Sequence, residues 1–424
     1  MNKSLTLWLA LCLLLAGAAS SRTWNIYPDG SGDAATIDDG VHLASGGDTV
    51  LVHPGEYTEN IYMSVSYVSL VSSGGNAVTV LKNERGEGWA IIYGPCRGGL
   101  IQGFTFQGVP GKSGPGITLV CDSGMLAAEI EDNVFVDLVA YQGGGVDLYD
   151  GASAAITRNE FRNCTGWDVG GGVSISYGSS ARIEDNTFSG CYSKVGGAIG
   201  CSGNSTCEVI GNTLEDNEAL ENGGGVFLYE CPSGLVEDNV LKANHANLAG
   251  GGVYVYDGSF EVRWNIFWSN RARYGGGLAQ SLGAGLTCEN NTFFENTASD
   301  CGSAARLGGD VASRFAGCIV SNSSGAAAVD CIRLPLPEVD CNAFYMNPGD
   351  YRGCSPGPHD VFACPSFCFA DAGDFELCDE SPCLPGNHPG GYDCGLIGAL
   401  GQGCSCGPTA VRPTTLGAIK AMYR

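Results

Sequence analysis

A short pattern of apolar and polar positions recurs along the middle of the chain. An aliphatic residue is followed three positions later by Asn, and two positions after that by Phe or Leu. The Asn of each copy occupies Asn133, Asn159, Asn186, Asn212, Asn239, Asn265 and Asn291, with Cys288 in the aliphatic slot of the last copy. The copies follow one another at about 26 residues, and a fixed period between ~20 and ~50 residues is typical of a solenoid.

Each repeat has room for two or three short strands and lacks a helix-length apolar pattern, so successive repeats are expected to pair strand on strand. This favours an all-β fold, a right-handed parallel β-helix with coils of about 26 residues. A leucine-rich repeat shares the period and the Asn, but its closely spaced leucines are missing. A second motif, the glycine phrase, recurs with the same period: two or three glycines followed by a strand of alternating inward and outward residues. Its glycines are Gly143 to Gly145, Gly170 to Gly172, Gly196 to Gly197, Gly223 to Gly225, Gly250 to Gly252 and Gly275 to Gly277.

The repeated Asn suits a tight bend, because Asn tolerates left-handed backbone angles and its amide can hydrogen-bond to the Asn of the next coil ~4.8 Å away. The aromatic residue two positions later is expected to point inward and stack. A second Asn column lies five residues after the first, at Asn217, Asn244, Asn270 and Asn296. These features predict regular coils over residues 126–300 within a β-helix spanning 21–350.

The two ends of the solenoid differ from its middle. Thr36, with Asp39 three positions later, resembles a helix capping box, so a short helix at about residues 35–45 is expected to cover the first coil. Residues 351–411 are rich in Cys and should form a loop-rich closing segment. Residues 412–424 are basic and resemble the sorting or anchoring tails of exported bacterial proteins, although a frayed terminus is the simpler interpretation.

The first 20 residues are typical of a secretory signal peptide: Lys3 is basic, Leu5 to Leu15 is apolar, and small residues follow up to Ser20. A secreted or surface location is therefore expected. Of the 21 Cys, Cys12 lies in this segment, and an even 20 remain, which favours disulfides. We expect Cys164 to pair with Cys191 because they occupy the same slot of adjacent coils.

Cys201 with Cys207 is a second, local candidate pair. Metal binding by the crowded carboxyl end is less favoured, because the spacing lacks paired CxxC motifs and His is scarce, so no metal is predicted. The formal charge of −24 argues against nucleic acid and anionic membranes as partners. It also argues against polyuronates unless calcium bridges them; no other cofactor is indicated. No segment after the signal peptide approaches the length of a membrane span.

The ends of the chain carry a family resemblance. The segments Tyr27 to Asp33, Gly47 to Val52 and Pro54 to Asn60 resemble the opening of exported right-handed parallel β-helix proteins of the pectin-lyase-like superfamily, of bacterial surface type. Gly373 to Leu377 and Gly395 to Ala399 resemble the segment that closes many of its bacterial members. The resemblance implies the fold and leaves the function open.

Known catalytic patterns of such proteins are not found. Carbohydrate esterases of this fold carry a Gln-Asp pair, a second Asp and a distal Arg beside Trp, and no such set occurs. Of the polygalacturonase motifs only an Asp-Asp pair appears, Asp38-Asp39, on the expected helix. Arg333-Leu334-Pro335 lacks the second Arg of pectate lyases. A hydrolase needs two carboxylates roughly 5 to 10 Å apart. Glu131-Asp132, Glu184-Asp185 and Glu237-Asp238 offer carboxylates, but they are outward repeat positions. Catalytic residues are therefore unknown, and an enzyme is not favoured.

Two outward-facing groups are candidates for glycan binding. Alternation along the glycine strands places four aromatic residues on neighbouring coils of one face: Phe227, Tyr229, Tyr254 and Tyr256. They could stack on sugar rings, or they could simply favour strands. The second group lies six residues after the repeat Asn of three adjacent coils, and its members should stack on one another: Glu218, His245 and Arg271. They could bind a glycan, or they could form an ordinary ladder of surface charges.

The sequence therefore predicts an exported β-helix protein with a structural or carbohydrate-binding role, whose partner is a polysaccharide or cell-surface glycan. The alternative is a polysaccharide lyase or glycoside hydrolase with an unrecognised active site.

Overall fold

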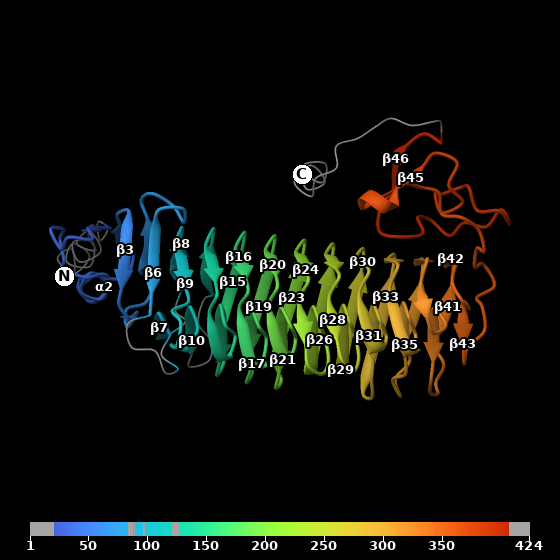
Figure 1. The fold of residues 1–424 in the computed structure, drawn as a ribbon, viewed down its shortest axis with the longest axis horizontal. Coiled ribbons are helices and arrows are strands. Elements are labelled where there is room, and N and C mark those ends of the chain that lie inside the picture. Colours follow the sequence, from blue (N-terminus) through green and yellow to red (C-terminus); the bar gives the residue numbers. More distant parts are fainter. Residues whose placement is uncertain (1–20, 84–87, 89, 96–97, 121–126, 407–424) are drawn as a thin grey trace, which may run out of the picture.

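A computed structural model describes residues 21–83, 88, 90–95, 98–120 and 127–406. It confirms the all-β prediction: the chain winds into a right-handed parallel β-helix (Figure 1). The predicted signal peptide and basic tail lie outside the described residues. Within the described part, no helix is long and apolar enough to cross a membrane.

A regular coil contains four strands in a fixed order. Pre-Asn strands lead to the Asn bend, and post-Asn strands follow it. Third strands come next, and glycine strands follow the glycine phrase. Strands β26 (Val226–Glu237) and β29 (Val253–Arg263) run from a glycine strand straight into a pre-Asn strand. Each strand pairs in parallel with the equivalent strand of the next coil, as in Val146 with Val173.

The pre-Asn strands are β1 (Thr23–Ile26), β2 (Thr49–Val52), β5 (Ser69–Ser72), β8 (Leu100–Gln102), β11 (Ala128–Glu131), β15 (Ser153–Thr157), β19 (Ser180–Glu184), β23 (Thr206–Ile210), β33 (Ala284–Glu289), β37 (Arg314–Ala316) and β41 (Glu338–Asp340). The post-Asn strands are β3 (Gly55–Thr58), β6 (Thr79–Lys82), β9 (Thr105–Gln107), β12 (Val134–Val136), β16 (Glu160–Arg162), β20 (Thr187–Ser189), β24 (Thr213–Glu215), β27 (Val240–Lys242), β30 (Ile266–Trp268), β34 (Thr292–Phe294), β38 (Ile319–Ser321) and β42 (Ala343–Tyr345).

The third strands are β13 (Val139–Gln142), β17 (Thr165–Val169), β21 (Tyr192–Val195), β25 (Glu218–Ala219), β28 (His245–Ala246), β31 (Arg271–Tyr274), β35 (Thr297–Cys301) and β39 (Ser324–Gly325). The remaining glycine strands are β4 (Ile61–Tyr62), β7 (Ile92–Pro95), β10 (Ile117–Val120), β14 (Val146–Tyr149), β18 (Val173–Ile175), β22 (Ile199–Ser202), β32 (Leu278–Gln280), β36 (Ala305–Leu307), β40 (Val329–Cys331) and β43 (Tyr351–Arg352).

The predicted Asn column is present and buried. The side-chain oxygen of Asn212 accepts hydrogen bonds from the backbone and side-chain nitrogens of Asn186, at 2.9 and 3.0 Å. Its own side-chain nitrogen donates to Asn239 at 3.0 Å. The left-handed backbone, however, lies one position before the Asn, for example at Asp185 and Asp238, both with φ 56°. The Asn therefore stabilises the bend through its side chain, which bonds the amides that the bend leaves free.

The predicted phenylalanine stack fills the interior beside this column. Ring centroids lie 4.7 Å apart between Phe135 and Phe161, and 4.5 Å apart between Phe161 and Phe188. The glycines of the second phrase allow the coils to pack closely: a Cβ added at Gly171 would lie 2.2 Å from the Gly197 carbonyl oxygen. Larger residues there would separate the coils.

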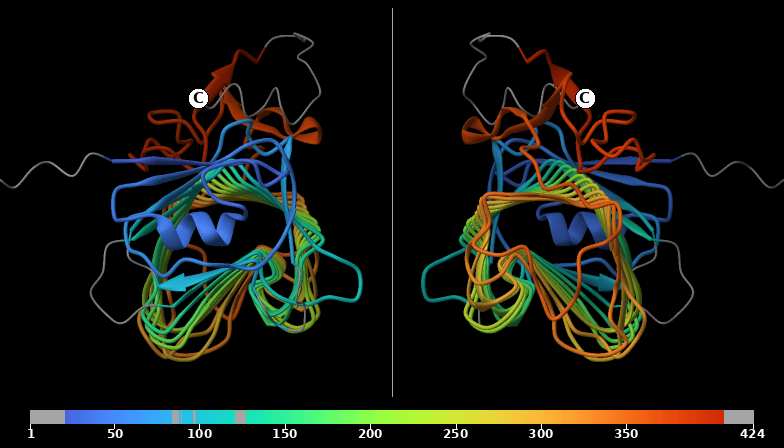
Figure 2. Two further views of the ribbon diagram at one scale, coloured as in Figure 1. Left: turned by 90° about the vertical axis from the view of Figure 1, so that its left-hand side faces the viewer. Right: turned by 90° about the vertical axis from the view of Figure 1, so that its right-hand side faces the viewer.

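At the amino end, helix α2 (Ile37–Leu43) lies across the open end of the solenoid (Figure 2). The Thr36 side chain accepts a hydrogen bond from the Asp39 amide at 3.0 Å, as the capping pattern predicts. Ile37 and Val41 are fully buried against the first coils. The helix therefore covers core residues that would otherwise face water.

At the other end, a small cap folds back along the outside of the solenoid (Figure 1). It contains β44 (Phe367–Phe369), the 3₁₀ turn Ala370–Ala372, β45 (Asp374–Cys378) and β46 (Gln402–Cys404). Phe375 from the cap packs on Phe294 and Trp268 of the post-Asn strands, with centroids 5.2 and 5.5 Å apart.

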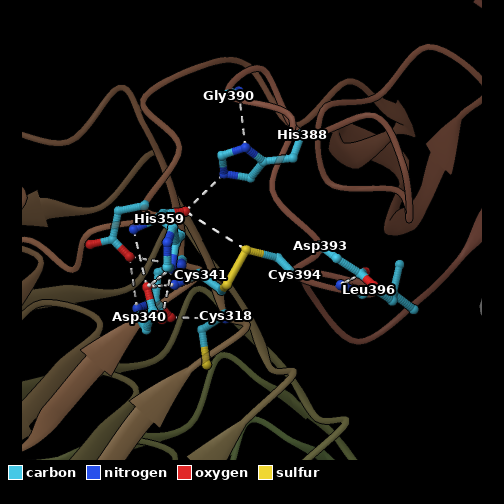
Figure 3. The surroundings of a disulfide bond; sticks show 12 residues. Cys318, Asp340, Cys341, His359, His388, Gly390, Asp393, Cys394 and Leu396 are labelled. Atoms are coloured by element: carbon cyan, nitrogen blue, oxygen red, sulfur yellow. Dashed lines mark hydrogen bonds and ion pairs between the residues drawn. A yellow bond between two sulfur atoms is a disulfide. The ribbon is translucent and has the colours of Figure 1, made fainter.

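Disulfides hold this end together, as expected for a Cys-rich closing segment. They are Cys331–Cys354, Cys341–Cys394, Cys368–Cys404 and Cys378–Cys406. Figure 3 shows Cys341–Cys394 joining the last coils to the cap, beside His359 and Asp340. The four cysteines for which pairs were expected, Cys164, Cys191, Cys201 and Cys207, are buried thiols in this structure.

Candidate functional site

The outward side of the glycine strands forms one continuous column of side chains across the coils. We call it the glycine-strand face. Its first outward positions, in register from coil to coil, are Tyr93, Thr118, Asp147, Ser174, Gly200, Phe227, Tyr254, Ala279, Arg306, Asp330 and Arg352. The next outward position carries Tyr149, Tyr229 and Tyr256 in their coils. The face carries one acidic residue, Asp147, near its amino-terminal end, aromatic residues in its middle, and two arginines with Asp330 between them near its other end.

The four aromatic residues predicted on this face lie together on two adjacent coils. Phe227 stacks on Tyr254 with centroids 5.5 Å apart, and Tyr229 on Tyr256 at 4.7 Å. The expectation that all four rings are exposed is wrong for two of them: Phe227 is 6% exposed and Tyr254 is 9% exposed.

These two rings are covered because the third strands fold back against the glycine strands. Phe227 and Tyr254 form a small second core with Val195 and Ala249, and Tyr229 and Tyr256 lie at its rim, half-buried. A sugar could therefore reach only the outer pair. The role of the four residues in glycan binding stays a prediction.

The second predicted group is a stack on the third strands. Glu218 pairs in register with His245, and His245 with Arg271. His245 Nδ1 lies 3.9 Å from a Glu218 carboxylate oxygen, and both side chains are substantially exposed. This geometry fits a surface charge ladder as well as a ligand site, so its role also stays a prediction.

A cavity opens at the amino-terminal end of the glycine-strand face. Its volume is about 470 Å³, and its lining includes Asp147, Tyr93, Tyr141, Tyr149 and Gln142. The rings of the three tyrosines are 40%, 67% and 39% exposed, respectively. Ligand sites are typically cavities of ~300 to 1,000 Å³ with aromatic walls and a few polar groups, and this one fits that description.

Asp147 has the most unusual environment in this cavity. One of its carboxyl oxygens is buried without a hydrogen-bond partner. Burial raises the pKa of Asp147 to about 7, and the nearby Ser174 hydroxyl opposes that shift. A carboxyl group with such a pKa in a cleft is a candidate for binding or for proton transfer.

The tyrosines around Asp147 are themselves supported by further aromatic rings. Tyr93 stacks on Tyr62 with centroids 5.8 Å apart, and Tyr149 meets Tyr177 edge-on at 6.2 Å. Burial, followed by the proximity of Tyr149 and Tyr62, raises the pKa of Tyr93. Tyr93 and Tyr141 were not singled out from the sequence. The glycine-strand alternation before residue 143 is too irregular to align Tyr93 with Tyr149 from the sequence.

The opposite end of the face is basic. Arg352 binds Asp330 through two hydrogen bonds of 2.8 and 2.7 Å. Arg306 lies one coil before Asp330, and its Nε is buried without a partner among the described residues. The guanidinium carbon of Arg306 lies 5.2 Å from the centroid of the Tyr274 ring.

A wider hollow of about 750 Å³ crosses the outer side of the pre-Asn strands. Its charged residues are paired with one another: Arg182 binds Glu208 at 2.7 Å, and Arg263 binds Glu261 at 3.0 Å. The repeat carboxylates Glu184 and Glu237 are likewise held by arginines. This surface is a salt-bridge ladder, as expected for outward repeat positions.

Two clusters of potential metal ligands occur in the described residues, Asp340-Cys341-His359 and Cys378-Asp379-Cys406. Their cysteines are engaged in disulfides and cannot serve as thiolate ligands. Neither cluster therefore offers three available ligands.

Comparison with known proteins supports the fold. Residues 115–293 match the family model for a right handed beta helix region. The A-module of a mannuronan C-5 epimerase from Azotobacter vinelandii is similar, with 15% identity and a TM-score of 0.54 over 78% of this chain and 94% of that one. An alpha-1,3-glucanase catalytic unit from Streptomyces thermodiastaticus has 14% identity and a TM-score of 0.41, over 78% and 67% of the two chains.

An alginate lyase of the PL6 family has 12% identity and a TM-score of 0.42, over 90% of this chain and 59% of the lyase. These structural neighbours are carbohydrate-active enzymes by name. At such low identity the similarity shows the fold alone. No curated protein sequence matches the chain.

Proposed function

We propose that this right-handed β-helix protein binds a glycan on its glycine-strand face, with the Asp147 cavity as the main sugar site. The carbohydrate-binding role is the one predicted from the sequence, but the main site is the Asp147 cavity and not the cluster around Phe227. The observation that carries the proposal is a half-buried carboxyl group in a cavity lined by three exposed tyrosines.

The chemistry of the cavity suits a sugar. Tyrosine rings provide flat apolar surfaces for the C–H faces of a pyranose, and their hydroxyl groups remain available for hydrogen bonds. The Asp147 side chain is half-buried and lines the cavity, so its carboxyl group can accept a hydrogen bond from a sugar hydroxyl. Gln142 adds an amide that can donate and accept.

Unsatisfied polar atoms gather on the same face. Among the described residues, six buried side-chain atoms lack a hydrogen-bond partner, and four of them belong to this face: Asp147 Oδ1, Ser174 Oγ, Ser176 Oγ and Arg306 Nε. Ser174 and Ser176 are 0% and 2% exposed, so of these four side chains only those of Asp147 and Arg306, which are half-buried, are open to a ligand.

The pKa of Asp147 also favours a second function, that of a polysaccharide lyase or glycoside hydrolase. A residue with a pKa near 7 could transfer a proton at neutral pH. A glycosidase needs a second carboxylate within ~10 Å, however, and no other carboxylate lines the described part of the cavity. Binding is therefore the better-supported function.

The test is a panel of polysaccharides measured for retention and for released products. We expect at least one glycan to be retained without product release. At pH 8, where the Asp147 carboxyl group is mostly ionised, Asp147→Asn should weaken its binding about 10-fold or more, since a hydrogen bond to a charged group contributes roughly 1.5 to 3 kcal/mol. Tyr149→Ala should weaken binding similarly, because Tyr149 lines the cavity.

The control is Arg162→Gln, which alters an exposed side chain on a post-Asn strand, paired with Glu160. It should bind like the parent. Unchanged binding by both cavity variants would overturn the proposal, and product release that depends on Asp147 would establish the enzymatic alternative.

A further inference from the structure

The basic end of the glycine-strand face bears on the class of glycan, and the inference rests on the proposed function. We infer that Arg306 forms a subsite for an isolated anionic substituent, a carboxylate or a sulfate, on an otherwise mostly neutral glycan. The subsite lies at the opposite end of the face from the Asp147 cavity.

Like Arg271 and Arg333, and unlike the other arginines among the described residues, Arg306 forms no ion pair. Arg158, Arg182 and Arg263 each lie within 3.0 Å of a carboxylate. By contrast, no described carboxylate lies within 4.0 Å of the Arg306 guanidinium. The Nε of Arg306 is buried, but the side chain as a whole is only half-buried, so an outside anion would contact its terminal nitrogens.

The carboxylate nearest in register, Asp330, acts on Arg306 through its charge but makes no hydrogen bond to it. Asp330 follows it by one coil, but both oxygens of Asp330 are bound by Arg352 in a two-bond fork. Arg273 is likewise paired with Asp300 at 2.7 Å. The positive charge of Arg306 is therefore the local surplus, and it remains available to a ligand.

The surroundings of Arg306 also fit a sugar acid. Tyr274 presents its ring to both Arg306 and Arg273, with guanidinium carbons 5.2 and 4.9 Å from the ring centroid. A guanidinium held beside a ring offers its remaining N–H groups in a fixed fork, which matches the two oxygens of a carboxylate or sulfate.

The spacing indicates a polymeric ligand. Six coil steps separate the rows of Asp147 and Arg306, which corresponds to about 29 Å at the usual strand spacing. Between them lie the half-buried rings of Tyr229 and Tyr256. A chain that occupies both ends would therefore cross this aromatic rim.

The net charge limits how acidic the ligand can be. With a formal charge of −24, the protein repels a densely charged polyanion over most of its surface. A single anionic group at Arg306 gains the local contact without that general repulsion. We therefore expect sparse acidic substituents to be favoured and polyuronates to be disfavoured.

The experiment compares neutral polysaccharides with lightly carboxymethylated, lightly sulfated and heavily carboxymethylated derivatives of the same backbones. For a backbone that binds, either or both lightly substituted forms should bind about 10-fold more tightly than the neutral form, and the heavily substituted form should bind more weakly than the light one. The two light derivatives distinguish a carboxylate from a sulfate site.

Arg306→Gln should remove the preference for the light derivatives while leaving affinity for the neutral polymer unchanged. Arg306→Lys should keep part of this preference. Arg162→Gln removes one positive charge, as Arg306→Gln does, and should keep the full preference. If the neutral and light forms bind the parent equally, or if Arg306→Gln keeps the preference, this inference is wrong while the proposed function stands. If no polysaccharide binds, both are wrong.

Discussion

At the scale of single residues, Asp147 is placed where its charge is disfavoured. Its backbone belongs to an ordinary glycine strand, and the inward neighbours Val146 and Leu148 are fully buried in the solenoid core. The side chain lines the same cavity as three tyrosines, and one of its carboxyl oxygens is buried and unpartnered. Such unfavourable placement is typical of positions retained for binding or catalysis.

We predict a pH-dependent effect of Asp147→Asn on stability. Folding raises the pKa of Asp147 from 3.8 to about 7, so between these pH values the folded protein keeps a proton that the unfolded chain releases. The free energy of unfolding therefore falls as the pH rises from about 4 to 7. In urea unfolding, the variant should be more stable than the parent at pH 8, on the order of 1 to 4 kcal/mol, and nearly equal to it below pH 4.

Asp150→Asn, in the same coil and exposed, is the control and should change stability little at either pH. A variant less stable than the parent at pH 8 would contradict the account of Asp147.

Buried repeat positions could be predicted from the sequence, whereas outward positions of the candidate site could not. Asn and Phe positions were predictable because each coil repeats the same buried environment, as at Asn212 and Phe188. Tyr93 and Thr118 come from early coils where the spacing is irregular. Tyr141 lies on the third strand β13 of a regular coil, where an outward position imposes no pattern of its own. The burial of Phe227 and Tyr254 was missed because it depends on where the third strands fold.

At the scale of elements, the position of each cysteine within its coil determines which residues of the adjacent coils lie beside it. Cys164 and Cys191 occupy the slot that Asn217 and Asn244 fill in the next two coils, and all four are buried. The same buried position of the coil therefore holds a thiol in one part of the solenoid and a hydrogen-bonded Asn side chain in another. Cys201 lies beside both Cys207 and Cys231.

We predict that oxidation links adjacent coils. Cys164 should pair with Cys191, and Cys201 should pair with Cys231, because the sulfur atoms of the second pair are already 3.4 Å apart. Cys207 would then remain a thiol in place of the local pair suggested by the sequence. Peptide mapping without reductant should recover both bonds, with a reduced sample as control. Finding Cys164 or Cys191 free would count against the stacked pair.

At the scale of the whole molecule, the two ends of the solenoid are closed by different means. The amino end is covered by α2, whose Ile37 and Val41 are fully buried. The carboxyl end has few buried residues of its own and relies on Cys368–Cys404 and Cys378–Cys406. A small segment with little core generally needs such crosslinks to remain ordered.

We therefore predict that reduction loosens the cap before it affects the coils. With a mild reductant, hydrogen exchange should accelerate within residues 365–406 while backbone amides around Asn186 stay protected. An unreduced sample measured in parallel is the control. Simultaneous loss of protection in both regions would show that the cap does not depend on its disulfides.

The Asn column determines which insertions and deletions the solenoid can accept. Each Asn accepts from the preceding coil and donates to the following one, as Asn212 does between Asn186 and Asn239, so every regular coil carries the same two joints. Duplication or deletion of one whole coil keeps both joints matched, whereas an insertion of another length within the column breaks it. Adding or removing one whole coil would change the length of the solenoid by about 4.8 Å.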